Sequence, residues 1–285
     1  MTRIEVLKTY KMYIGGKFPR TESGRYFTLK NAKGEEIANM CTGSRKDFRN
    51  AVVAARKAQE PWANRTAYNR SQILYRIAEM LEGRKAQFID ELMHMGSTKK
   101  QAEEEVFTSI DRLIYYAGWA DKYQQISSSV NPVSGPYFNF TVHEPTGVVA
   151  VIAPEENGLI GLVSTIAPII VSGNSCIVLA SESKALCSIS FAEVVNSSDV
   201  PGGVINILTG NAEELIPHFS THMDVNSMLY CRNDKKAIQL IKENSTTNLK
   251  RIVVKKDIDW MKGDNESPYF ITKFTEVKTT WHPIE

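Results

Sequence analysis

The chain has 285 residues, with 34 Lys and Arg against 32 Asp and Glu, which gives a formal net charge of +2. Apolar residues make up 42% of the chain and charged residues 23%, and this composition excludes a largely disordered protein. A nearly neutral chain has no broad basic surface, so neither nucleic acid nor an anionic membrane is an expected partner. No apolar run approaches the roughly 20 residues that a membrane-spanning helix requires.

The opening residues and the cysteines both indicate a cytoplasmic protein. Residues 1–16 carry charges and lack the apolar centre of a signal peptide. The four cysteines form no Cys-x-x-Cys pair, which favours reduced thiols. His218 and His222 have the i, i+4 spacing of some zinc ligands, but no matching Glu or Cys motif accompanies them, so we predict no metal site.

The first 125 residues are predicted to be mainly helical after a short β-opening. Residues 10–18 indicate two short strands around a Gly15-Gly16 turn. Ser44 and Asp47 form a capping-box pattern ahead of apolar residues at helical spacing. Two further helices are expected from the apolar stripes within residues 73–81 and 101–123.

A different pattern follows the serines at 127–129. Residues 137–142 alternate between two faces, as a strand does. Short β-rich runs then alternate with helical segments, which is typical of a parallel sheet covered on both faces. We therefore predict an α/β fold, a Rossmann-like doubly wound parallel sheet of about five strands with an added bridging β-region. The strands are expected at 148–153, 175–179, 204–208, 227–231 and 250–254, with helices at 159–171, 188–195, 212–218 and 235–243.

Several motifs, in register over most of the chain, resemble the aldehyde dehydrogenase family. They are YIGGK at 13–17, PWA at 61–63, YAGWAD at 116–121, EPTGVV at 144–149, IAP at 152–154 and PGGVIN at 201–206. FTEVKT at 274–279 resembles the last strand of the same family. The resemblance implies an ancestral enzyme in which a cysteine thiolate attacks an aldehyde and hydride passes to NAD.

The resemblance also implies that the catalytic positions are degenerate. It places Glu156 where an asparagine amide stabilises the oxyanion, and a carboxylate there repels the developing charge. It places Lys255 where a glutamate is the general base, and lysine has the wrong charge for that role. No cysteine follows Cys231, and residues 257–285 are too short for the family's catalytic domain, which we expect to be absent.

The cofactor positions implied by the resemblance are altered as well. The ribose-binding Lys-Pro-Ser-Glu of the family aligns with residues from Ala180 to Ser183. The glycine-rich phosphate turn aligns with residues from Cys231 to Lys236, where side chains replace both glycines. We therefore expect the ancestral NAD site to be lost and no cofactor to bind.

The parts that the family uses for assembly are retained. The resemblance divides the chain into an N-terminal helical part at 1–125, bridging strands at 126–144, a Rossmann-like sheet at 145–256, and a linker with a C-terminal strand at 257–285. An uncovered aromatic edge is an aggregation hazard, and strand addition to a partner covers it. A reciprocal homodimer is not expected, because the acceptor domain is absent. The predicted interface residues are Tyr137, Phe138, Phe140, Val142, Phe274, Val277 and Trp281.

The whole pattern resembles the degenerate second module of tandem aldehyde dehydrogenases. The leading hypothesis is a catalytically inactive subunit that assembles by strand addition with a full-length aldehyde dehydrogenase paralogue and supports or regulates it. One alternative is a protein with residual nucleotide binding or weak oxidoreductase activity. A second alternative is a structural component of another complex.

Overall fold

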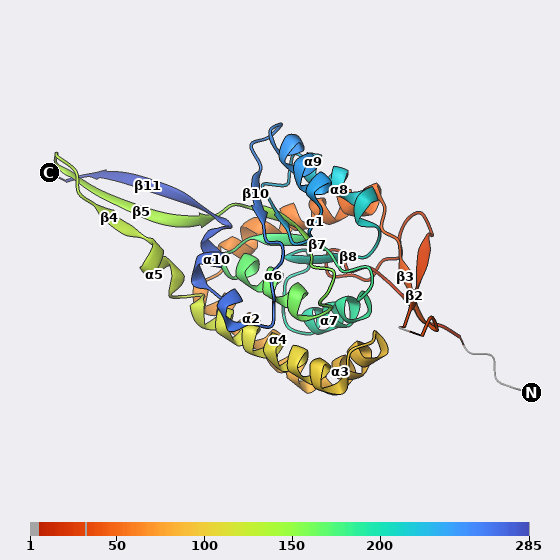
Figure 1. Cartoon of the computed structure of the whole chain (residues 1–285). Coiled ribbons are helices and arrows are strands. Elements are labelled where there is room, and N and C mark those ends of the chain that lie inside the picture. Colours follow the sequence, from red (N-terminus) through yellow and green to blue (C-terminus); the bar gives the residue numbers. More distant parts are fainter. Residues whose placement is uncertain (1–5, 32, 285) are drawn as a thin grey trace, which may run out of the picture.

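The computed structural model describes residues 6–31 and 33–284, so the first five residues of the charged opening lie outside the described chain. A central parallel sheet lies between two layers of helices, and a separate antiparallel sheet projects far beyond this body (Figure 1). Among the described residues, no helix combines the length and the apolar character needed to cross a membrane.

The central sheet confirms the predicted doubly wound fold. Its five strands are all parallel and lie in the order β10-β9-β6-β7-β8, so the chain reverses its winding direction between β6 and β9. Such a reversal creates a crevice at the carboxyl ends of the strands, where ligands bind in this class of fold. The strands are β6 (Val148–Ile152), β7 (Ser175–Leu179), β8 (Ile205–Leu208), β9 (Ser227–Tyr230) and β10 (Arg251–Val254).

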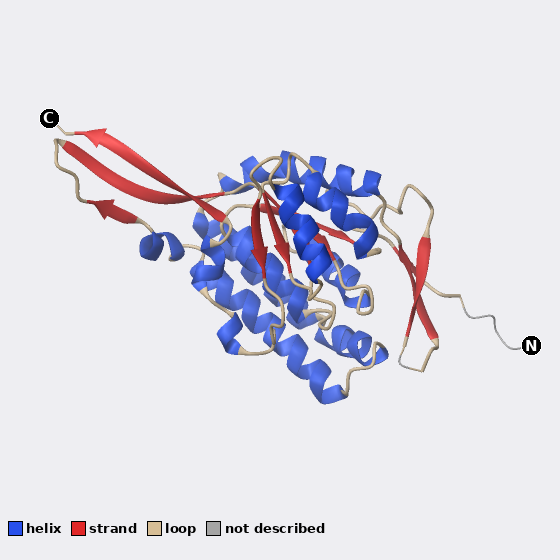
Figure 2. Ribbon diagram, turned by 45° about the horizontal axis from the view of Figure 1, so that its top comes forward, coloured by secondary structure: helices blue, strands red, loops and turns tan. Residues whose placement is uncertain are grey.

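Alternate residues of β6 face two different helical layers. Val149 and Val151 belong to the larger core, whereas Val148 and Ala150 belong to the smaller one, as expected when successive side chains point to opposite faces. Figure 2 shows helices on both sides of the sheet. The larger layer contains α2 (Ala67–Gly83), α3 (Lys85–His94), α4 (Lys99–Trp119), α6 (Ile160–Val171) and α7 (Leu186–Asn196), and the smaller contains α1 (Arg45–Ala63), α8 (Ala212–Thr221) and α9 (Lys235–Ser245).

The start of α1 follows directly from the sequence. The Ser44 hydroxyl accepts the Asp47 amide, and the Asp47 carboxylate accepts the Ser44 amide at 2.9 Å. This reciprocal pair satisfies two amides that would otherwise lack partners at the first turn. The predicted capping box is therefore confirmed.

The N-terminal β-region differs from the prediction. Gly15 and Gly16 do form a turn with positive φ angles, but isolated bridges flank it instead of strands. The chain also forms a small sheet and the helix α3, which were not predicted. In that sheet β1 (Thr9–Tyr10) pairs in parallel with β3 (Glu36–Cys41), and β2 (Tyr26–Lys30) pairs with β3 in the antiparallel sense.

We call the antiparallel sheet of β4 (Ser129–Asn131), β5 (Tyr137–Pro145) and β11 (Thr275–Pro283) the projecting sheet. It follows the short helix α5 (Tyr123–Ser127), and β5 and β11 pair along their whole lengths. Figures 1 and 2 both show that it extends away from the helical layers. The strand predicted at 137–142 is therefore present, but it is longer than expected.

The segment between β10 and β11 packs against the body instead of forming an extended run. It contains a 3₁₀ turn (Gly263–Asn265) and α10 (Pro268–Thr272), and Trp260 and Phe270 are buried in the larger core. The buried Arg112 side chain of α4 donates to the Trp260 and Lys262 carbonyls and pairs with Glu266 at 3.0 Å. The C-terminal strand therefore begins only at Thr275, because Ser267 and Pro268 start a helical turn ahead of it.

Candidate functional site

The residues that follow β6, β7, β9 and β10 form what we call the carboxyl edge of the central sheet. Glu155 follows β6, Glu182 follows β7 and Arg232 follows β9, each within three residues of its strand. Because parallel strands end on the same side, these three charged residues meet at the crevice of the fold.

Arg232 is the centre of a charged network at this edge. Its guanidinium donates to the Ala153 carbonyl at 3.0 Å and to the Ala180 carbonyl at 3.1 Å. It also pairs with Glu155 at 3.0 Å and with Glu182 at 3.3 Å, and its side chain is only 14% exposed. One side chain therefore links the ends of three strands.

The two carboxylates are held by backbone amides as well. Glu155 accepts the Glu182 amide at 3.1 Å and the Ser183 amide at 2.7 Å. Glu182 accepts the Ala212 amide, at the first residue of α8, at 2.9 Å. A negative charge is favourable at that position because the amides of a helix N-terminus carry partial positive charge. This network was not predicted, since its members are far apart in the sequence.

The structure brings the four predicted cofactor positions to this same edge. Ala180 contributes its carbonyl to Arg232, and Ser183 contributes its amide to Glu155. Cys231 is buried at the end of β9. The Lys236 amide donates to the Asp234 side chain at 2.8 Å, so the first turn of α9 is capped by the chain itself.

A cavity of about 480 Å³ lies between β2 and the carboxyl edge. Glu155 and Glu182 form part of its wall, and Thr28 and Lys30 of β2 lie on the other side. A carboxylate at the end of a strand, beside a helix N-terminus, is the type of group that binds a ribose hydroxyl in a Rossmann-like fold.

The two predicted catalytic positions lie in different surroundings. Glu156 lines a cavity of about 340 Å³ together with Glu104 and Glu105. Glu105 was not predicted; it is buried, accepts the Leu159 amide at the start of α6 at 2.8 Å, and burial raises its pKa. The same cavity is also lined by Asn157 and Lys184, so its wall carries donors as well as carboxylates, but the predicted oxyanion position itself holds a carboxylate in place of an amide donor.

Lys255 does not line that cavity. Its ammonium lies 3.9 Å from the centroid of the Phe270 ring, and partial burial lowers its pKa. This cation–π contact ties the end of β10 to the segment that precedes β11.

The four cysteines, Cys41, Cys176, Cys187 and Cys231, are all free and buried. Burial raises the pKa of Cys176, Cys187 and Cys231, because an apolar environment disfavours a thiolate. None of these three is therefore prepared as a nucleophile in this structure.

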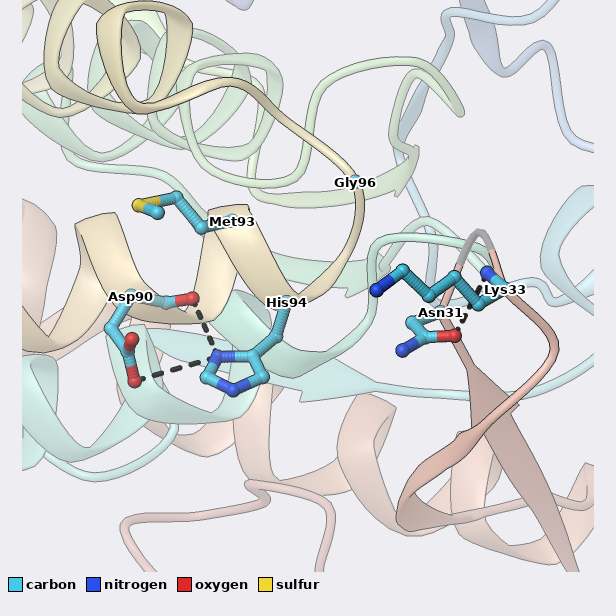
Figure 3. Close-up of a pocket in the computed structure, with 6 residues that line it drawn as sticks. All are labelled: Asn31, Lys33, Asp90, Met93, His94 and Gly96. Carbon is cyan, nitrogen blue, oxygen red and sulfur yellow. Dashed lines mark hydrogen bonds and ion pairs between the residues drawn. The ribbon is translucent and has the colours of Figure 1, made fainter.

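Another hollow, of about 420 Å³, lies between the β2–β3 connection and the end of α3 (Figure 3). His94 Nδ1 lies 2.8 Å from the Asp90 carbonyl and 3.4 Å from its carboxylate, and Lys33 lines the opposite side. The His94 and Asp90 side chains are more than half exposed, so water screens their charges. None of the predicted site residues lines this hollow.

Most of the predicted interface residues lie on the projecting sheet. Tyr137, Phe138, Val277 and Trp281 are exposed, and Phe140 and Val142 are half-buried. Phe138, Phe140 and Val142 line an apolar hollow of about 330 Å³.

Phe274 is placed differently from the prediction. It precedes β11 and is completely buried in the larger core, packed 5.5 Å from Phe270 between ring centroids. Its side chain stabilises the body and is not available to a partner.

A sequence model of the aldehyde dehydrogenase family matches residues 18–256. The chain belongs to the aldehyde dehydrogenase family. It is 31% identical to the putative aldehyde dehydrogenase DhaS of Bacillus subtilis, over 78% of this chain and 45% of that protein. It is also 31% identical to human aldehyde dehydrogenase 1A1, over 86% of this chain and 49% of that protein. The chain thus spans about half the length of these curated relatives.

A solved structure titled as the NAD⁺ complex of an aldehyde dehydrogenase from Bacillus cereus has the same fold. Its TM-score is 0.82 at 25% identity, over 87% of this chain and 51% of that one. Together with family membership, this likeness contradicts our expectation that no cofactor belongs to this chain. The expectation was based on replaced motif residues, but Glu182 and the cavity beside it fit the ribose end of a dinucleotide.

Proposed function

We propose that this chain is a non-catalytic aldehyde dehydrogenase subunit that assembles with a full-length aldehyde dehydrogenase and supports or regulates it. The projecting sheet is the surface that joins the two proteins. The observation that carries the proposal is the exposure of apolar side chains on the projecting sheet, which extends outside the body and which we also call the arm.

The shape of the projecting sheet supports this role. Its strands β5 and β11 pair over nine residue pairs, so the arm is an ordered sheet with free edges. Val277 is 60% exposed and Trp281 is 59% exposed. Exposed apolar residues clustered on a sheet mark an interaction surface, because water solvates them poorly. A partner strand that pairs with the sheet covers them and satisfies its edge.

The chemistry of the body supports the non-catalytic part of the proposal. The predicted oxyanion position is Glu156, beside two further carboxylates, and the predicted base position is Lys255, packed on Phe270. Neither residue is the type that the family's acyl chemistry uses at that position, which is an oxyanion donor in the first case and a general base in the second.

Sedimentation of a mixture tests the proposal. The purified chain is combined with a purified full-length aldehyde dehydrogenase from the same cells, and the mass of the species is measured. We expect one complex of fixed stoichiometry, with an altered stability or aldehyde oxidation rate of the full-length enzyme. Two proteins that sediment independently at micromolar concentration would contradict the proposal.

A second candidate function is binding of a nicotinamide dinucleotide at the carboxyl edge. Glu182 would accept the ribose hydroxyls, and the Arg232 guanidinium supplies a cation at the same edge. The dinucleotide supplies a hydride acceptor when bound, and we assign no reaction step to this chain.

Thermal unfolding with increasing NAD⁺ or NADP⁺ tests this second candidate. A ligand that binds only the folded chain raises Tm, and the stabilisation grows with the logarithm of the ligand concentration above Kd. We expect a rise that Glu182→Gln reduces and that Glu35→Gln, on an exposed turn, leaves unchanged. A constant Tm at millimolar nucleotide would contradict dinucleotide binding.

A further inference from the structure

The two edge strands of the central sheet, β8 and β10, differ in whether another segment of the described chain pairs with them. At the β8 edge, Tyr13 exchanges two backbone hydrogen bonds with Ile207, at 2.9 and 2.8 Å. At the β10 edge, no strand of the described chain pairs on the outer side. The sheet therefore has one edge covered by its own chain and one that is free.

The free edge offers backbone groups to a partner. Arg251, Val253 and Lys255 form the ladder toward β9, so the peptide groups of the alternate residues Ile252 and Val254 point outward. All four residues of β10 are half-buried, whereas the other four strands are completely buried. An extended segment can pair with such an edge through main-chain hydrogen bonds.

A groove lies beside this edge, between α9 and β10, with a volume of about 470 Å³. Ile238 and Val254 provide its apolar surface, and both are only partly exposed. Its charged residues are three lysines and one glutamate, so the groove is positively charged. The charged residues are Lys235, Lys242, Lys256 and Glu243.

The lysines of the groove have no acidic partner in the described chain. None of the three takes part in an ion pair, whereas the Glu243 carboxylate accepts a hydrogen bond from Gln239 at 2.8 Å. The groove therefore has three lysines against one carboxylate, and a negatively charged segment would be attracted to it.

We propose that the β10 edge binds an extended acidic segment of a partner protein, which adds to the central sheet as a sixth strand. The side chains on one face of the segment enter the groove, where its apolar residues contact Ile238 and Val254 and its carboxylates lie near Lys242 and Lys256. No residue of the projecting sheet lines this groove, although Arg251 at the start of β10 pairs with Glu276 of β11 at 2.9 Å. The groove therefore gives the subunit a second, charge-selective contact near the base of the projecting sheet.

Fluorescence anisotropy with a defined peptide tests the proposal. The probe is a short labelled peptide whose one face carries both valine and glutamate and whose other face carries threonine. The comparison peptides carry lysine in place of glutamate, or N-methyl groups on the amides that would face β10. We expect saturable binding of the acidic peptide alone. The double substitution Lys242→Glu with Lys256→Glu should weaken it at least about tenfold, because attraction becomes repulsion.

A matched pair of substitutions controls for net charge. Lys33→Glu with Lys57→Glu changes two exposed lysines elsewhere and should leave binding unchanged. Hydrogen exchange should show that the bound peptide protects the Ile252 and Val254 amides. If the charge-reversed variant fails to fold, Lys242→Gln with Lys256→Gln makes the same comparison. Absence of saturable binding, equal binding of the lysine peptide, or unprotected β10 amides would each overturn the proposal.

Discussion

The carboxyl edge and the projecting sheet differ in how their side chains are accommodated. At the carboxyl edge, Arg232 pairs with Glu155 and Glu182, and each carboxylate also accepts a backbone amide. On the projecting sheet, Phe138 and Trp281 are exposed apolar side chains on the surface of the arm. The charged groups of the ancestral ligand crevice are internally paired, whereas the apolar groups of the arm are not covered.

This difference indicates which of the two surfaces gains more free energy when a partner or ligand binds to it. Covering apolar surface is favourable by roughly 25 cal/mol per Å², and the arm has such surface exposed. A ligand at the carboxyl edge must instead compete with hydrogen bonds that already exist, and exchanging one set of bonds for another yields little net stabilisation. The comparison therefore favours assembly through the arm as the main role.

The largest expected effect is loss of assembly when charge is placed on the arm. Phe138→Asp combined with Trp281→Asp should weaken the complex with the full-length enzyme about a thousandfold, because each carboxylate must be desolvated at the interface. Folding should be unaffected, since both side chains are exposed. Titration calorimetry measures the affinity, and Val53→Asp with Tyr68→Asp on the helical body is the control. Equal losses from both pairs would remove the distinction between arm and body.

Substitutions at two neighbouring residues, one in the body and one on the arm, should have different effects on the free energy of unfolding. Phe274→Ala should lower the free energy of unfolding by about 3–4 kcal/mol, because it opens a cavity in the core. Val277→Ala, three residues later and 60% exposed, should change it by less than about 0.5 kcal/mol. Urea unfolding provides both values. Similar values for the two would mean that the boundary between body and arm is misplaced.

A substitution at the carboxyl edge should affect stability without affecting assembly. Arg232→Met removes the guanidinium from two carboxylates, which keep only their backbone amides, and from two carbonyls, so we expect a loss of about 2–3 kcal/mol. Arg25→Met is the control, since its pair with Glu214 is exposed and should contribute less than about 1 kcal/mol. Chemical denaturation and calorimetry with the full-length enzyme measure the two properties. A weakened complex would show that the edge takes part in assembly.

The last prediction concerns the pH dependence of stability that arises from Lys250, which is buried beside the central sheet. Burial lowers the pKa of Lys250 to about 8, and its ammonium donates to the His222 and Val225 carbonyls. The pKa of lysine in an unfolded chain is about 10.4. Between about pH 8 and 10 this side chain is therefore protonated in the unfolded chain but has lost its proton in the folded one. The free energy of unfolding should therefore rise with pH, by up to about 1.4 kcal/mol per unit. Lys250→Met should flatten this slope in urea titrations, and an unchanged slope would assign it to another group.

The central sheet was predictable because its strands are short apolar runs with turn signals between them. Val148–Ile152 and Ser175–Leu179 are completely buried, and complete burial produces continuous apolar sequence. Tyr26–Lys30 contains aromatic and β-branched residues that favour a strand, and it pairs in a small separate sheet. The prediction missed β2 although this local signal was present.

The functional surfaces were predictable to different degrees. The alternation at 137–142 revealed the arm, because period-two patterning is local. The Arg232 network was missed because Glu155 and Glu182 lie 77 and 50 residues away in sequence, and only the sheet brings them together. Phe274 was assigned to the arm because it opens the motif that resembles the family's last strand, whereas the helical turn at Pro268 places it in the core.

Native purification of this chain from its own cells tests the central claim most directly. The mass of the purified species is measured, and the co-purifying proteins are identified. The account predicts a full-length aldehyde dehydrogenase at fixed stoichiometry, which is lost when Phe138→Asp and Trp281→Asp are introduced. A chain that purifies without any aldehyde dehydrogenase, as a monomer or as a homo-oligomer, would contradict it.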